Sequence, residues 1–159
     1  MILVLLGTQD KPFLRLLKMV SKEIDKGNIK EKVVAQTGYT AFSDKNMESF
    51  DFKNKEEIEK LIDKARLIIT HAGVGTITEC LEKGKKIIVV PRLKKYLEHT
   101  NDHQMQITKE FEMKGYVIAL YDKSRLSAAL DKIKTFKPKK YESNSENFRM
   151  KIKDYIDNI

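Results

Sequence analysis

Short apolar runs unbroken by polar residues constrain the fold of this chain most strongly. The clearest occupy residues 2–6, 67–69 and 86–90, and weaker candidates lie at 32–36 and 116–120; residues 49–52 suggest a further short strand by their alternation instead. Hydrophobic residues that follow one another without alternation are typical of strands covered on both faces, as in a parallel sheet. The chain is therefore expected to build a sheet with helices on both sides.

Segments with helical spacing of apolar residues separate these runs. Phe13, Leu16, Leu17, Val20 and Ile24 recur at this spacing, and glycines end several of the segments. We predict helices over residues 12–26, 54–65, 77–83, 102–114, 124–133 and 147–159. The alternation predicts an α/β fold with a doubly wound, Rossmann-like parallel sheet.

The length of 159 residues fits one domain, residues 1–159, in which 143–159 carry a C-terminal helix. That helix is expected to pack on its own sheet or on a partner. The formal net charge of +8 favours an anionic partner: a nucleic acid, an acidic membrane surface or a phosphorylated substrate.

One cysteine, Cys80, excludes a disulfide framework and a cysteine-based zinc finger. The apolar start at residues 2–6 is too short for a signal peptide. No run approaches the ~20 apolar residues that cross a bilayer. We therefore expect a cytoplasmic protein that does not itself span a membrane.

Three informative loops follow predicted strands, at residues 7–9, 71–76 and 91–102. Ligands of doubly wound sheets bind at the carboxyl ends of the strands. These loops predict one site. In the loop at 71–76, glycines permit close approach of a ligand, and the following helix offers free N–H groups for a phosphate or diphosphate. Thr76 and Thr78 could add hydroxyl donors; the alternative is a plain glycine turn.

The sequence disfavours one familiar phosphate motif and lacks another. A dinucleotide fingerprint would need a third glycine where Thr78 stands and an acidic residue after the next strand, and a P-loop would need Gly-Lys-Ser/Thr. The spacing of His71, His99 and His103 matches no compact metal motif, and there is no Asp-x-Asp pair. We expect no metal, and Cys80 is interpreted as a small core residue.

Taken with Glu79, Gly84-Lys85, Pro91-Arg92 and Glu98-His99 through Gln104, the loop at 71–76 resembles the C-terminal domain of family 28 glycosyltransferases. The resemblance covers nearly the whole chain, including its start at residues 4–13. It implies the C-terminal half of a GT-B fold, which binds a UDP-sugar donor. The UDP-sugar is a substrate, and no cofactor is implied.

Stand-alone versions of this half belong to two-part enzymes. The resemblance therefore implies a membrane-anchored partner subunit that holds the acceptor and recruits this chain to the cytoplasmic face of the membrane. The reaction implied is transfer of a galactosyl or N-acetylglucosaminyl group to a lipid-linked acceptor, in capsule, exopolysaccharide or N-glycan synthesis. Because the acceptor half is absent here, catalytic residues stay unassigned.

The resemblance also assigns donor-binding residues. These are Gly7, Thr8, His71, Gly73, Val74, Gly75, Thr76, Glu79, Arg92, His103 and Gln104. Residues 73–76 would cradle the diphosphate, Glu79 would hold the ribose, and Arg92 would lie near the uracil or phosphates. His103 and Gln104 would approach the sugar hydroxyls, while residues 7–8 would face the cleft between the two halves.

Simpler roles exist for several of these residues. Glu79 could merely complement the helix dipole, Asp102 is a plausible N-cap, and His103 could be a surface histidine. At the level of function, the main alternative is a non-catalytic accessory subunit that enhances a partner transferase. A nucleic-acid binder is a further alternative, but no nucleic-acid motif accompanies the basic residues, and we expect no nucleic-acid partner.

Overall fold

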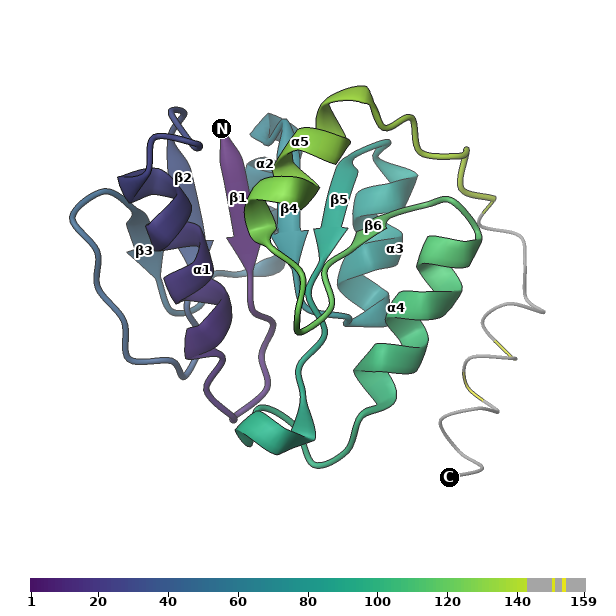
Figure 1. Cartoon of the computed structure of the whole chain (residues 1–159), viewed down its shortest axis with the longest axis horizontal. Helices are drawn as coiled ribbons and strands as arrows, with labels where there is room; N and C mark the ends of the chain where they lie inside the picture. The colour runs from purple at the N-terminus through teal and green to yellow at the C-terminus, as the bar shows by residue number, and fades with distance from the viewer. Residues whose placement is uncertain (143–149, 151–152, 154–159) are drawn as a thin grey trace.

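The computed structural model of the chain describes residues 1–142, 150 and 153. Six parallel strands form one sheet in the order β3-β2-β1-β4-β5-β6 (Figure 1). The strands are β1 (Ile2–Leu5), β2 (Val33–Gln36), β3 (Glu48–Phe50), β4 (Leu67–Thr70), β5 (Lys86–Val89) and β6 (Ile118–Ala119). The order reverses direction next to β1, which confirms the doubly wound, Rossmann-like sheet.

Helices cover both faces of the sheet. They are α1 (Leu14–Asp25), α2 (Lys55–Lys64), α3 (Val74–Glu82), α4 (His103–Met113) and α5 (Leu126–Thr135), with a short 3-10 turn η1 (Lys94–Tyr96). In Figure 1, α1 and α5 lie in front of the sheet and α2 and α3 behind it. Ile2 and Val4 pack in the core under α1 and α5, while Leu3 and Leu5 pack in the core under α2, α3 and α4. This two-sided burial explains the unbroken apolar runs.

Local signals explain where two helices begin. Asn54 caps α2 with a full capping box: its side chain accepts from Glu57 N–H, and the Glu57 carboxylate accepts from Asn54 N–H. The predicted cap is confirmed. Helix α1 begins at Leu14 rather than at Pro12, because Phe13 N–H donates to the buried Thr40 hydroxyl and Phe13 takes the N-cap position.

Helix α3 begins three residues earlier than predicted, with Gly73 as an extended N-cap. The glycine segment therefore supplies the first helical turn instead of a separate loop. Asp102 is the N-cap residue of α4, as predicted, but its carboxylate accepts from Lys94 N–H and makes no capping hydrogen bond to the helix.

Three further predictions have separate outcomes. Cys80 is fully buried and burial raises its thiol pKa to about 12, which confirms the core interpretation. No helix among the described residues is long and apolar enough to cross a bilayer. The helix predicted over 147–159 lies outside the described residues, apart from two isolated positions.

Candidate functional site

The imidazole of His71 is held between two glycines from different loops. A Cβ on Gly73 would lie 2.7 Å from His71 Nε2, and a Cβ on Gly7 would lie 2.9 Å from its Cε1; other ring atoms are closer still. Gly7 also has φ of +76°, which L side chains rarely adopt. Glycine is therefore required after β1 and after β4 because any larger residue at position 7 or 73 would clash with the His71 ring.

Gln104 fixes the orientation of this histidine. Its Oε1 accepts from Ala72 N–H at 3.2 Å and from Arg92 N–H at 3.0 Å. Its Nε2 therefore faces His71 Nδ1 as a donor, at 3.3 Å. Because Nδ1 accepts, the ring proton of the neutral imidazole belongs on Nε2.

His71 stays neutral at physiological pH. Burial, and next the nearby Arg92 charge, lower the pKa of His71 to about 4. Among the described residues no hydrogen-bond partner is found for Nε2. The site therefore contains a rigid, uncharged imidazole with a free N–H donor, between Gly7 and Gly73 at the carboxyl ends of β1 and β4.

The amino end of α3 lies next to this histidine and is open. Its first intrahelical hydrogen bond runs from Ile77 N–H to Gly73 O, at 3.0 Å. In the described part of the chain no side chain caps the helix, and its first turn has no acidic residue. A Cβ on Gly75 would meet nothing within 4 Å. The N–H groups of residues 74–76 and the positive helix end therefore remain available for an anion.

Glu79, one turn further along α3, has a buried oxygen without a partner. Its Oε1 makes no hydrogen bond within the described residues. A buried acceptor without a partner is uncommon, and a ligand hydroxyl would satisfy it; in the same described part of the chain, Arg92 Nε and Gln106 Oε1 are buried without a partner as well. Thr78, by contrast, donates its hydroxyl to the carbonyls of Val74 and Gly75, and is already satisfied inside the helix.

Arg92 is buried and supports the neighbouring loops. It is 1% exposed, and its guanidinium donates to the carbonyls of Leu6, Lys11 and Glu98 at 2.8, 2.7 and 3.2 Å. Burial lowers the pKa of Arg92 to about 10, against the opposing effect of Glu98. In this arrangement Arg92 ties the loop after β1 to the loop after β5 and does not present its charge to solvent.

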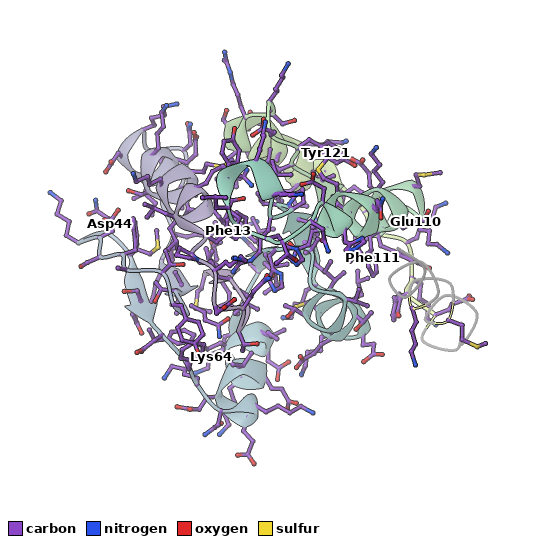
Figure 2. The ribbon with its side chains drawn as sticks, turned by 90° about the horizontal axis from the view of Figure 1, so that it is seen from below. Phe13, Asp44, Lys64, Glu110, Phe111 and Tyr121 are labelled. Carbon is purple, nitrogen blue, oxygen red and sulfur yellow. The ribbon has the colours of Figure 1, made fainter. Side chains whose placement is uncertain are left out.

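A second arginine reinforces the same loop from α1. Arg15 forms a bidentate pair with the buried Glu98, at 2.9 and 2.8 Å, and also donates to Pro91 O. Both guanidiniums contact the Phe13 ring, whose centroid lies 4.8 Å from Arg92 Cζ and 5.3 Å from Arg15 Cζ. Figure 2 looks onto this end of the molecule, and Phe13 lies near the middle of the view.

The structure therefore connects five of the expected residues directly: Gly7, His71, Gly73, Arg92 and Gln104. Residues 74–76 and Glu79 adjoin them on α3. Thr8 is exposed in the loop after β1. The His103 side chain has no hydrogen bond to the glycine segment among the described residues, and the Gln104 amide is used by the protein itself. Contact of these two side chains with a sugar stays a prediction.

Sequence reasoning missed an aromatic pair at the same end of the sheet. Tyr39 and Phe52 follow β2 and β3, are 60% and 44% exposed, and meet edge to face at 5.1 Å between ring centroids. A Cβ on Gly38, between them and the site, would lie 3.1 Å from Gly7 O and 3.8 Å from the Phe52 ring. The sequence signal that could have revealed this pair is the position of each aromatic residue after a short strand.

A doubly wound sheet with an open helix end at its carboxyl edge is an arrangement typical of domains that bind nucleotides and other anionic ligands. The family model for the Glycosyltransferase family 28 C-terminal domain matches residues 1–159, and the chain belongs to this family.

Relatives with curated names include the UDP-N-acetylglucosamine transferase subunit ALG13 of Homo sapiens, 36% identical over 42% of this chain. The Candida albicans subunit of the same name is 33% identical over 51%. A UDP-N-acetylglucosamine–N-acetylmuramyl-(pentapeptide) pyrophosphoryl-undecaprenol N-acetylglucosamine transferase of Clostridium tetani is 30% identical over 84%. These matches span 6%, 26% and 34% of the relatives' own lengths.

Solved structures share the fold. The glycotransferase of kitacinnamycin has a TM-score of 0.64 at 19% identity, covering 84% of this chain and 34% of that one. The NMR structure of ALG13 has a TM-score of 0.59 at 20% identity, covering 94% and 93%. The sheet is accordingly equivalent to the C-terminal half of a GT-B glycosyltransferase.

Proposed function

We propose that this chain binds the donor of a two-part glycosyltransferase, which moves an N-acetylglucosaminyl group from a UDP-sugar to a lipid-linked acceptor. The observation that carries the proposal is the open amino end of α3 beside the neutral imidazole of His71. The names of the relatives favour N-acetylglucosamine over galactose as the sugar. The name of the Clostridium relative also specifies a lipid-linked acceptor, a pyrophosphoryl-undecaprenol.

The chemistry follows from where charge develops. As the bond between the anomeric carbon and the diphosphate oxygen breaks, negative charge grows on the departing UDP. The N–H groups of residues 74–76 and the positive end of α3 would stabilise that charge, and the His71 Nε2 proton would add one donor. No step in this account requires a metal ion, so we propose metal-independent transfer.

The rest of the donor would be recognised around this anchor. Glu79 would accept two hydroxyl hydrogen bonds from the ribose, satisfying its buried oxygen. Tyr39 and Phe52 offer aromatic surface for the base. Arg92 and Gln104 would act as positioning residues, because their hydrogen bonds fix His71 and the loop backbones.

The partner in this proposal is a membrane-anchored subunit that holds the acceptor at the cytoplasmic face. Synthesis of a capsule, an exopolysaccharide or an N-glycan precursor is the setting we propose. The acceptor-binding half would provide the catalytic base, because we assign none to this chain.

Isothermal titration tests donor binding. The chain should bind UDP and UDP-N-acetylglucosamine, and Glu79→Gln should weaken UDP more than it weakens 2′,3′-dideoxy-UDP. Glu82→Gln, on an exposed part of the same helix, is the matched control. Absence of UDP binding at millimolar concentration, alone and with a partner, would sink the donor-site proposal; equal losses for both nucleotides would remove the ribose role.

An accessory role is the second candidate. It is favoured by the internal use of Arg92 and Gln104, two residues expected to touch the donor. Gly75→Trp would place an indole at the start of α3, where a Cβ meets nothing within 4 Å. If the partner keeps full activity with this variant, the accessory role is correct; loss of activity with retained partner binding supports the donor role.

A further inference from the structure

We propose that the loop between β5 and α4, together with the start of α1, binds the surface of an anionic lipid bilayer directly. We call this surface the tip patch. It consists of Pro12, Leu14, Lys18, Lys94, Tyr96 and Leu97. Tyr96, Pro12, Leu14 and Lys18 line one open hollow at this end of the molecule, and Lys94 and Leu97 flank Tyr96 in the chain.

Leu97 is the central observation. It is 79% exposed, and it is the only non-glycine residue with positive φ, at 59°, in the described part of the chain. Leucine is disfavoured in this left-handed conformation, which glycine or asparagine adopts readily. Its apolar side chain also gains nothing from projecting into water. Leu97 thus combines an unfavourable backbone conformation with an exposed apolar side chain, and such a combination is expected where a residue serves a function.

The tip does not fold back to cover this leucine, because its backbone is fixed. Leu97 N–H donates to Lys94 O at 2.9 Å, and Leu93 N–H donates to the Glu98 carboxylate at 3.0 Å. Arg15 holds that buried carboxylate from α1. The exposed side chains at residues 96–97 are therefore presented on a rigid support.

Free positive charges surround the apolar tip. Lys18 and Lys94 form no ion pair within the described residues, and neither does Lys22, which lines the same hollow. Arg15 is neutralised by Glu98, and Lys95 by Asp122. Two acidic residues remain nearby: Asp10, and Asp102, which accepts from Lys94 N–H. The balance over the patch is positive.

This combination fits a bilayer better than a protein partner. Lysine is depleted in protein–protein interfaces, whereas tyrosine, an inserted aliphatic side chain and peripheral lysines are the usual means of binding an anionic membrane interface. The patch lies at the carboxyl end of the strands, shown at the bottom of Figure 1, as does the amino end of α3. Membrane contact there would bring the proposed donor site close to a lipid-linked acceptor. The inference itself depends on neither UDP nor a partner subunit.

Vesicle co-sedimentation of the whole chain tests the proposal. The probes are vesicles of phosphatidylcholine alone and of phosphatidylcholine mixed with phosphatidylglycerol. We expect binding to the mixed vesicles only, weakened by salt. Leu97→Asn should reduce it about tenfold, and Lys18→Gln with Lys94→Gln should reduce it about tenfold or more.

Matched controls exist on α4. Met113 is 80% exposed, like Leu97, but lies at the far end of the helix, so Met113→Ser should bind as the unaltered chain does. Lys109→Gln is the charge control. Leu97→Asn should also keep or raise the melting temperature, because it relieves backbone strain, so that lost binding is not caused by unfolding.

The outcomes separate the sources of binding. No association with anionic vesicles, or equal association of the Leu97→Asn and unaltered chains, overturns the proposal. Loss with Met113→Ser as well would show non-specific adsorption and overturns it too. If Leu97→Asn impairs only the complex with a partner subunit, the patch is a protein interface and the bilayer assignment is wrong.

Discussion

Replacing Gly73 by alanine should destabilise the protein, whereas the same change two residues later should not. The new Cβ at position 73 would lie 2.7 Å from His71 Nε2 and closer still to Cε1, so the buried ring must move. Overpacking of this kind costs about 1–3 kcal/mol. Moving the ring also breaks its contact with Gln104, and a lost buried hydrogen bond costs about 1–3 kcal/mol.

The expected total for Gly73→Ala is about 2–6 kcal/mol of unfolding free energy, from those two costs together. At about 2–4 °C per kcal/mol for a domain of this size, that lowers the melting temperature by roughly 4–24 °C. Gly75 lies in the first turn of α3 with open space around its Cβ position. Alanine there should be neutral, or should stabilise by up to about 1 kcal/mol through helix propensity.

Thermal unfolding and urea titration measure both variants, and a double-mutant cycle tests the cause. In a His71→Ala background the clash and the ring's contact with Gln104 are both absent, so Gly73→Ala should cost little or nothing there. If Gly73→Ala and Gly75→Ala have the same stability, or if the cost of Gly73→Ala is unchanged without His71, the packing argument is refuted.

Three further outcomes are expected. His71 has a folded pKa of about 4 against an ordinary 6.5, so its contribution to stability is fully present above pH 6.5 and is lost as pH falls towards 4. This loss totals about 3 kcal/mol. His71→Asn should flatten the pH dependence of the unfolding free energy between pH 4 and 6.5. An unchanged dependence on pH would count against a buried neutral ring. Glu98→Gln should cost about 3–5 kcal/mol because it leaves Arg15 and Arg92 without their buried counter-charge, while Glu110→Gln on exposed α4 surface should change urea unfolding little. With a partner subunit, transfer should survive EDTA treatment; activity restored only by added Mg²⁺ or Mn²⁺ would contradict the metal-independent route.

The sheet and the place of the site could be predicted because they depend on local patterns. Unbroken runs such as residues 2–6 require cover on both faces, and loops after parallel strands meet at one edge. The Asn54 cap could also be predicted from a local pattern because its partner, Glu57, is only three residues away.

Side-chain partners distant in sequence could not be predicted in this way. The spacing of residues does not reveal that Arg15 meets Glu98, 83 positions away, or that Gln104 bridges Ala72 and Arg92. Glycine at position 73 suggested close approach of a ligand, but the structure shows that the ring of His71 comes closest. The folded chain thus uses Arg92 and Gln104 to build a site around the open helix end.

Amide chemical shifts during titration with UDP test whether the amino end of α3 binds the diphosphate. The largest changes should fall on the N–H groups of residues 74–76, and uridine, which lacks the diphosphate, should leave them almost unmoved. Changes concentrated elsewhere, or equal changes with uridine and UDP, would contradict a diphosphate site at the amino end of α3.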